Sequence, residues 1–447
     1  MFSTFRNAWK IADLRRKILF TIMIILIFRI GAAIPVPFLD ATALQSLFPS
    51  FEVGQEASTN LFSYFNVLSG DAFSKATLFA MSVTPYINAS IIMQLLTVAI
   101  PPLERMAKEG EEGRKKIGTI TRFATVVLAL IQAIAYYVYL RNAVGPDGTA
   151  IQVVEYASGW QAWFSGIVIV VVLTAGSALM MWLGEQINKQ GIGNGISILL
   201  FAGIISRLPE AIQVLWAYFS AGLQEGGPKS YLFLIPIAII LFLAMIAFIV
   251  VLTDAERRIP VQYAKRVVGR KMYGGQSTHM PIKVNMSGVL PIIFASTILS
   301  IPQTIQMFVR NPSPFWEGFF NAFSTRGWLY GVLYFLLIIA FSYFYISIQY
   351  NPIEMANNLK KNNGAIPGYR PGKPTSDFIK RVISKIVLIG ALFLAVIAIL
   401  PIIFTAATGI NIAIGGTSIM IVVGVAIETV RQIESQMLMR HYKGFLE

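Results

Sequence analysis

The sequence predicts an all-α integral membrane protein with ten transmembrane helices. Three observations support this class: the composition, the apolar runs and the placement of basic residues. Hydrophobic residues make up 55% of the 447 positions and charged residues 13%, whereas soluble domains carry about 25% charged residues. A single water-soluble domain is therefore disfavoured. The chain has no cysteine and two histidines, so disulfides, thiolate metal sites and His-rich metal centres are excluded.

Ten apolar runs approach the roughly 20 residues that a helix needs to cross a bilayer. Their residues do not alternate, as those of membrane β-barrel strands do. The first run follows three consecutive basic residues and carries no small-residue cleavage pattern, so we expect a retained span rather than a removed signal peptide. The runs cover residues 18–34, 76–99, 118–140, 162–183, 192–207, 231–252, 287–308, 328–348, 382–404 and 411–430.

The basic residues indicate how these spans are oriented. With the N-terminus inside, 29 of the 36 Lys and Arg residues lie in inner segments, 6 lie in outer segments, and Arg29 lies within the first span. Cytoplasmic loops of membrane proteins carry the excess of Lys and Arg. Both termini are therefore predicted to be cytoplasmic.

The ten spans divide into five plus five at an outer loop near 208–230. This division predicts an N-terminal half of residues 1–215 and a C-terminal half of residues 216–447. Because five is odd, the second half crosses the membrane in the opposite direction, as in proteins that hold a path or a site between inverted repeats. An internal proline recurs in the second span of each half, Pro85 and Pro291. Gly and Pro are also frequent in membrane helices generally, and this alternative stays open.

The centres of the spans carry neutral polar residues but almost no ionisable ones. Secondary transporters and proton pumps usually place ionisable groups at this depth. The polar residues either form hydrogen bonds between helices, worth about 1 kcal/mol each, or line a contact zone that opens and closes. They are Asn88, Ser90, Gln94, Thr97, Gln132, Ser296, Thr297, Ser300 and Gln303.

No catalytic or nucleotide-binding pattern is present, so the chain is not predicted to be an enzyme. The patterns His-Glu-x-x-His, Gly-x-Ser-x-Gly and Gly-x4-Gly-Lys-[Ser/Thr] are all absent. A secondary transporter with inverted repeats is the second interpretation, and the lack of mid-span charges argues against it. A third interpretation, an intramembrane protease, lacks any nucleophile–base set.

Two large basic loops, 253–286 and 349–380, lie on the predicted cytoplasmic side. In the first, Ile259, Val261 and Tyr263 alternate with other residues, which predicts an exposed strand and a hairpin with basic residues near its turn. The charges reflect either the ordinary inner bias and attraction to anionic lipid, or a docking surface. Such a surface fits the phosphates of RNA or an acidic protein surface.

Several motifs, in order along nearly the whole chain, resemble the SecY family of bacterial protein-conducting channels. The matching strings are FRIGAAIPVP, TPYINASIIMQLL, EGEEGRKKI, GIGNGISI, QSTHMPIKVNMSGVLPIIFAS, NPIEMANNLKKNNGAIPGYRPG and GGTSIMIVV. The resemblance implies ten helices in two inverted halves around an hourglass pore. It also implies passage of unfolded preproteins across the bacterial plasma membrane and lateral release of apolar segments into the bilayer.

The resemblance further implies partners but no cofactor, metal or small-molecule substrate. Transport is driven by the SecA ATPase or by the ribosome, because the chain lacks a nucleotide loop of its own. SecE and SecG are the implied companion subunits. Signal sequences of preproteins and anionic lipid complete the set.

Four sets of site residues follow from the resemblance. The pore ring comprises Val83, Ile87, Ile196, Leu200, Ile293 and Ile421, with Thr297 one turn further along the seventh span. The plug, about 61–72, comprises Leu61, Phe62, Ser63, Tyr64, Phe65, Asn66, Val67, Leu68, Ser69, Gly70, Asp71 and Ala72, and Asp71 departs from the small residue often found in the family. The lateral gate comprises Asn88, Gln94, Gln132, Ser296 and Thr297. The motor or ribosome docking set comprises Arg257, Arg258, Lys265, Arg266, Arg270, Lys271, Lys360, Lys361 and Arg370.

Overall fold

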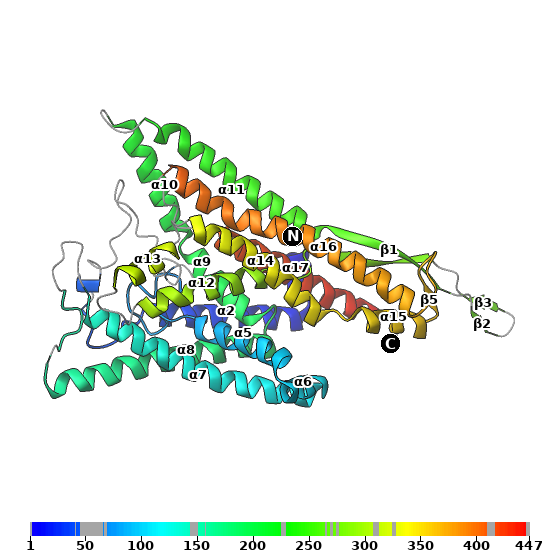
Figure 1. The fold of residues 1–447 in the computed structure, drawn as a ribbon, viewed down its shortest axis with the longest axis horizontal. Coiled ribbons are helices and arrows are strands. Elements are labelled where there is room, and N and C mark those ends of the chain that lie inside the picture. Colours follow the sequence, from blue (N-terminus) through cyan, green and yellow to red (C-terminus); the bar gives the residue numbers. More distant parts are fainter. Residues whose placement is uncertain are drawn as a thin grey trace.

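The structure is a computed structural model, and its helices run side by side along the long axis of the molecule (Figure 1). It describes residues 2–40, 42–44, 66, 69–143, 151–156, 158–224, 229–263, 266–268, 271–273, 277–306, 313–323, 328–408 and 416–443. Every predicted apolar run overlaps a helix. These helices are α2 (Ala12–Gly31), α5 (Thr84–Ala99), α7 (Glu111–Arg141), α8 (Trp160–Gln190), α9 (Gly195–Ser206), α11 (Tyr231–Asp254), α12 (Leu290–Gln306), α14 (Trp328–Gln349), α16 (Lys373–Thr408) and α17 (Gly416–Lys443).

Length and apolarity alone identify some of these ten helices as membrane spans. Among the described residues, six helical stretches are long and apolar enough to cross a bilayer, or seven if α5 and the following α6 (Pro101–Lys108), bent by 100°, form one span. The remaining predicted spans, α2, α12 and α17, are helical as well. The all-α membrane class is therefore confirmed.

Shorter elements join the spans. The helices are α1 (Phe2–Lys10), α10 (Leu208–Leu223), α13 (Pro314–Ala322) and α15 (Pro352–Lys361). The strands are β1 (Glu256–Tyr263), β2 (Arg266–Val268), β3 (Lys271–Tyr273), β4 (Ser277–Lys283) and β5 (Gly364–Ala365).

The second predicted span begins later than the hydropathy indicates. Residues 76–83 form turns instead of helix, with positive φ angles at Ala76 and Ser82. This start fits Pro85, which stands in the first turn of α5 and, lacking an N–H, cannot donate the backbone hydrogen bond that would continue the helix back toward residue 81. Pro291 likewise stands in the first turn of α12. The sequence predicts that both prolines lie inside their spans, and this prediction is wrong. In the structure both stand in the first turn of a helix, where proline is well tolerated.

The predicted outer loop near 208–230 is also wrong, because α10 occupies 208–223. Its buried residues, Ala211, Val214, Tyr218 and Gly222, recur at spacings of three and four, which place them on one face of a helix. A single turn residue, Arg207, separates this helix from α9 of the fifth span. The predicted boundary between the halves, 215/216, therefore falls within a helix and stays a prediction.

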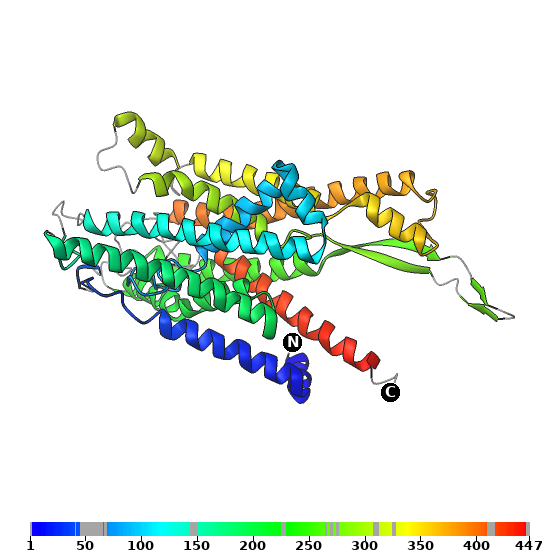
Figure 2. The same ribbon diagram turned by 90° about the horizontal axis from the view of Figure 1, so that it is seen from below.

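The predicted basic hairpin is confirmed, and it projects beyond the bundle at one end (Figure 1). Strands β1 and β4 pair antiparallel, with Ile259 opposite Met280. Ile259 and Val261 are buried while the residues between and before them are exposed, which is the alternation of a strand with one covered face. That face packs on residues of α15 and α16. Both chain termini lie toward this end of the molecule (Figure 2).

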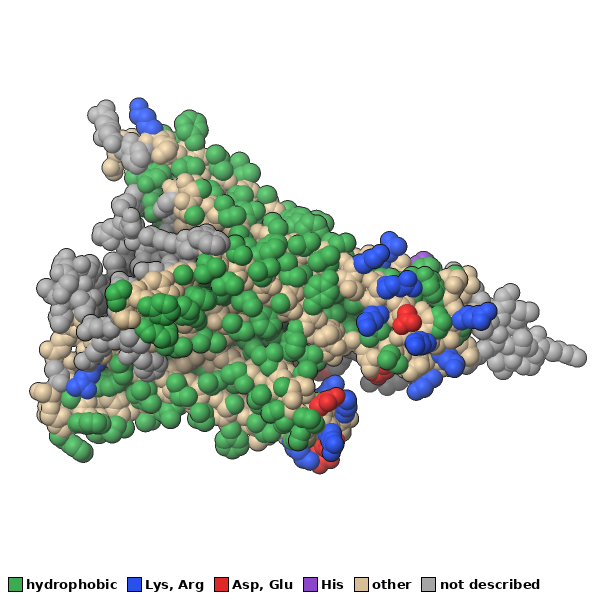
Figure 3. All heavy atoms as spheres, in the orientation of Figure 1, with side chains coloured by type: hydrophobic (Ala, Val, Ile, Leu, Met, Phe, Trp, Pro, Cys, Tyr) green, Lys and Arg blue, Asp and Glu red, His purple; other side chains and the backbone are tan. Residues whose placement is uncertain are grey.

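Apolar side chains cover the middle of the bundle, and charged ones gather at the hairpin end and around α6 (Figure 3). On α8, Trp163 and Trp182 are more than half exposed. They stand 19 positions apart in the sequence, and a helix rises about 28 Å over that length. The hydrocarbon core of a bilayer is about 30 Å thick, and Trp concentrates at its two interfaces. The exposed face of α8 thus fits the membrane.

Candidate functional site

The six aliphatic residues of the predicted pore ring come from the connection before α5 and from helices α5, α9, α12 and α17. All six belong to one apolar cluster, in which Ile196 is partly buried and the other five are buried. Thr297 is half-buried one turn beyond Ile293. The cluster also contains residues such as Phe28 and Phe79, so convergence is observed while the ring assignment itself stays a prediction.

Local sequence fixes how α9 enters this cluster. The Asn194 side chain caps the helix by accepting a hydrogen bond from the backbone N–H of Ile196 at 3.2 Å, as N-cap residues do. The backbone N–H of Gly195 donates to Asn188 Oδ1 at 2.7 Å. A Cβ at Gly195 would clash with the carbonyl oxygen of Gly184 on α8. The glycine-rich segment therefore presses the start of α9 onto α8 and directs Ile196 and Leu200 to the cluster.

Chemically, such a cluster can seal but not bind. Branched aliphatic side chains offer no ligand to an ion, and a narrow aliphatic constriction excludes water. Within the described ranges, no group of three or more His, Asp or Glu side chains is placed to hold a metal ion.

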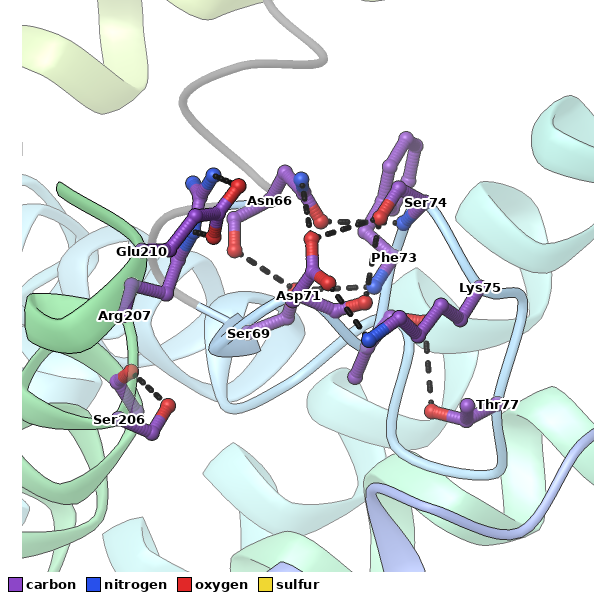
Figure 4. Close-up of polar contacts among 12 residues, drawn as sticks. Asn66, Ser69, Asp71, Phe73, Ser74, Lys75, Thr77, Ser206, Arg207 and Glu210 are labelled. Carbon is purple, nitrogen blue, oxygen red and sulfur yellow. Dashed lines mark hydrogen bonds and ion pairs between the residues drawn. The ribbon is translucent and has the colours of Figure 1, made fainter. Parts of the chain in front are cut away.

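The predicted plug is described at Asn66 and at 69–72, whereas Leu61–Phe65, Val67 and Leu68 lie outside the described residues. Asp71 is the centre of a polar network in this segment (Figure 4). Its carboxylate accepts hydrogen bonds from Asn66 Nδ2 at 3.0 Å and Ser74 Oγ at 2.8 Å, and pairs with Lys75 Nζ at 2.8 Å. Burial raises the pKa of the Asp71 carboxyl, but these donors, above all Lys75, outweigh it and hold the pKa below its ordinary value.

Gly70 sits where two helices meet the plug segment. Its φ is +64°, a conformation that glycine adopts without strain. A Cβ at this position would approach Gly203 O and Ser206 Oγ on α9 to 2.8 Å, and Arg29 Nη1 on α2 to 3.0 Å. Only a residue without a side chain fits between α2 and α9 here.

The segment after the plug, residues 72–83, packs to both sides. Ala72, Phe79 and Val83 join the pore cluster. Phe73 and Ala76 join a second cluster that includes residues of α7 and α8. This segment, which we call the plug connector, therefore links the cluster of the predicted pore residues to α7 and α8.

The predicted gate residues stand on α5 and α7 on one side and on α12 on the other. Among the described residues, α5 packs along α7 and α12 packs along α14, whereas contacts between these two pairs are sparse. Asn88 Oδ1 is buried without a hydrogen-bond partner in the described part of the chain. Ser296 Oγ donates to the carbonyl oxygen of Ile293, within its own helix, at 2.9 Å. The structure thus shows few backbone contacts across this seam, at the place where the gate is predicted, although side chains of α5 and α12 share the apolar cluster.

The predicted docking residues fall on one structural unit, except that Lys265 and Arg270 lie outside the described residues. Gln262 and Tyr263 of β1 pair with Ala365 and Gly364 of β5, so the two basic loops form one sheet. Arg257 and Arg258 are exposed on β1, and Lys360 and Lys361 end α15. Arg266 on β2 and Lys271 on β3 lie on a separate two-stranded sheet between β1 and β4 in the chain, and Arg370 precedes α16.

At the base of this unit, α11 and α17 are joined by an ion pair between Asp254 and Arg431. The Nη2 of Arg431 also donates to the carbonyl oxygen of Thr253 at 3.0 Å. Partial burial, together with the positive charge of Arg431, lowers the pKa of the nearby Lys283.

Two residues that contact the plug segment or the plug connector were not identified from the sequence. Tyr136 of α7 donates a hydrogen bond to the plug connector, and Arg29 of α2 reaches Gly70. The sequence shows Tyr136 one turn beyond Gln132 and Arg29 inside the first span. It does not show what either side chain contacts, because those partners lie far away along the chain.

Comparisons with known proteins agree with this architecture. The model of the SecY family matches residues 77–430. Curated relatives named protein translocase subunit SecY include those of Mycobacterium tuberculosis, 41% identical over 458 residues, and Streptomyces coelicolor, 43% identical over 454 residues, each covering all of both chains. The subunit of Thermotoga maritima is 42% identical over 450 residues, all of this chain and 98% of its own.

Solved structures share the fold. A protein-conducting channel and Sec61 of a canine ribosome–channel complex from the endoplasmic reticulum each align with a TM-score of 0.61. Each is 18% identical and covers 94% of this chain, with 92% of its own length aligned. The full-length identity to the curated relatives and the family match together establish that this chain belongs to the SecY family.

Proposed function

We propose that this chain is the channel subunit of a bacterial protein translocase and carries unfolded preproteins across the plasma membrane. The observation that carries the proposal is the convergence of six aliphatic side chains from four helices and the plug connector in one buried cluster. The relatives at 41–43% identity are all named translocase subunits. Both termini face the cytoplasm in this proposal, on the side of the basic sheet.

The pore ring works by having no specific chemistry. At rest its aliphatic side chains close on one another and exclude water and ions. A passing chain meets no hydrogen-bonding or charged group that would select one sequence, so many sequences slide through. The plug segment, held at Gly70 and Asp71, closes the path on the outer side.

The seam between α5–α7 and α12–α14 serves as the lateral gate. Insertion into lipid gains about 0.5 kcal/mol for each Leu and costs about 3 kcal/mol for Lys or Arg at mid-membrane. A run of ten or more Leu-like residues therefore leaves sideways into the bilayer, whereas a charged segment continues along the pore. The sparse contacts across the seam support an interface that opens reversibly.

Motion comes from outside the chain. SecA or a translating ribosome docks on the basic sheet, where Arg257 and Arg258 are exposed, and complementary charge favours an acidic or phosphate-bearing partner. A ribosome–channel complex stands among the structural neighbours. SecE and SecG complete the assembly. No step of this cycle requires bond chemistry by the channel itself, which is in this proposal not an enzyme.

Photo-cross-linking tests the proposed path. A stalled preprotein carrying a cross-linker is expected to react with residues at Ile293 and Ile421 during translocation. Ile240 on α11, which is exposed on the bundle surface, is the matched control and should not react. Labelling of Ile240 with none at Ile293 or Ile421 would refute the proposed pore.

Reconstitution separates this function from that of a secondary transporter. Vesicles containing the chain with SecE, SecG, SecA and ATP are expected to protect a preprotein from external protease. Uptake of labelled small solutes driven by an ion gradient, without preprotein protection, would favour the transporter instead.

A further inference from the structure

A cavity of about 400 Å³ lies between the end of α2 and the segment around the plug. It is at the end of α2 away from the basic hairpin (Figure 2). Its walls come from the last turn of α2 and the residues that follow it, and from residues 70–77. The lining residues that bear on the argument are Arg29, Asp71, Ser74 and Lys75 on the polar side and Ala33 and Pro35 on the apolar side.

Arg29 is the group in this cavity whose bonding needs explanation. Its Nη1 is buried and has no hydrogen-bond partner among the described residues. A buried donor without an acceptor carries a desolvation penalty, which is larger when the donor is charged. The position next to Gly70 keeps the guanidinium at the cavity wall. Within the described residues Nη1 therefore lacks an acceptor, although the carboxylate of Asp71 lines the same cavity.

The charges around the cavity favour a monoanion. Asp71 already pairs with Lys75 at 2.8 Å, so that these two charges compensate each other. Within the described ranges no carboxylate pairs with Arg29, whose guanidinium carbon lies 5.9 Å from the centroid of the Phe28 ring. A phosphodiester carries one negative charge and offers oxygens in the geometry that a guanidinium fork matches.

The surroundings favour a lipid as the source of that phosphodiester. Ala33 and Pro35 at the cavity wall are exposed, and so are Ile30 and Ile34 on the same stretch of chain. This stretch ends a predicted membrane span, where the headgroup region begins. We propose that the cavity binds the phosphate of an anionic phospholipid of the outer leaflet, with Arg29 as its principal ligand and Lys75 at the rim.

This site is distinct from the attraction of basic cytoplasmic loops to lipid, since it lies at the opposite end of the bundle. Its expected consequence is that an outer-leaflet lipid buttresses the closed plug, because Gly70 and Asp71 form part of the same walls. The inference concerns a binding site and does not depend on the channel function proposed above.

Native mass spectrometry tests the site directly. The full chain is reconstituted in phosphatidylcholine bilayers that contain a minor fraction of phosphatidylglycerol, then released, and retained phosphatidylglycerol is counted. The R29Q variant is expected to bind this lipid about tenfold more weakly, as loss of a charge-assisted hydrogen bond predicts. R141Q, an exposed arginine at the end of α7, is the control and should bind like the unchanged chain.

A second variant keeps the test valid if R29Q folds poorly. K75Q changes a largely exposed side chain and is expected to weaken lipid retention while the chain stays folded. In a parallel arm, inorganic phosphate is added to the phosphatidylcholine bilayers alone. Equal retention of phosphatidylglycerol by R29Q, K75Q and the unchanged chain overturns the site. Displacement of the lipid by inorganic phosphate overturns the assignment to lipid.

Discussion

The hydroxyl of Tyr136 on α7 donates a hydrogen bond to the carbonyl oxygen of Phe73 in the plug connector at 2.7 Å. The two rings also pack together, with centroids 4.6 Å apart. Tyr136 is 1% exposed, so water cannot replace this hydrogen bond if the hydroxyl is removed. Since α7 carries the predicted gate residue Gln132, this pair joins one side of the seam to the plug.

Replacing Tyr136 by Phe is expected to loosen that connection and to increase the resting ion leak. The change removes one buried hydrogen bond, worth about 1 kcal/mol, while the ring contact is kept. If the bond stabilises the closed state alone, the leak rises about fivefold. Chloride efflux from vesicles containing the channel measures it. The control is Y137F, whose hydroxyl lies 3.5 Å from Ala162 O on α8 instead of the connector. Equal leaks of Y136F and Y137F would contradict the coupling.

Replacing Gly70 by Ala is expected to displace the plug segment. The left-handed φ costs a non-glycine residue about 1–2 kcal/mol, and the new methyl group meets the backbone oxygen of Gly203. The closed state should therefore leak more than in Y136F, with folding of the helices intact by circular dichroism. G118A on α7, where a Cβ meets nothing within 4 Å, is the matched control. A resting channel as tight as the G118A control would rule out this role of Gly70 in holding the plug segment.

Acidification is expected to open the resting channel through Asp71. The pKa of this carboxyl is lowered in the folded state from 3.8. The sign follows from linkage: the stabilisation is fully present above the unfolded pKa and is lost as the pH falls through the folded pKa. Efflux should stay constant from neutral pH to about 5 and rise below 4. D71N, which cannot ionise, should leak at neutral pH and lose this acid response. An unchanged acid response in D71N would assign the effect to another group.

Replacing Asn88 by Leu is expected to change how apolar a signal sequence must be for lateral release. The buried Oδ1 of Asn88, unpartnered in the described part of the chain, costs the closed state about 1–3 kcal/mol of desolvation free energy. Replacing the amide by an apolar side chain should therefore stabilise the closed seam. Q132L, on α7, tests the second gate position. The measurement is membrane insertion of segments with increasing leucine content. T97V on α5, whose hydroxyl bonds within its own helix, is the control. An identical threshold in all variants would remove Asn88 and Gln132 from the gate.

Hydropathy and the basic residues predicted the class, the ten helices and the hairpin, because burial in lipid and strand alternation act residue by residue. The two errors had local causes. Pro85 moved the start of α5, and the stripe from Ala211 to Gly222 extended the fifth span into α10. The contacts of Tyr136 and Arg29 could not be predicted from the sequence, because each joins chain segments that meet only in the folded structure. Sequence motifs supplied the pore residues, and the structure adds that all six share one cluster.

The pairing of β1 with β5 has a mechanical consequence. Strand β1 continues from α11, and β5 leads toward α16, so a load applied to the paired strands is transmitted into the bilayer through two helices instead of one. A particle that seats there would tilt both helices together. Cutting the chain within either loop should then weaken force transmission less than unpairing Gln262 from Ala365.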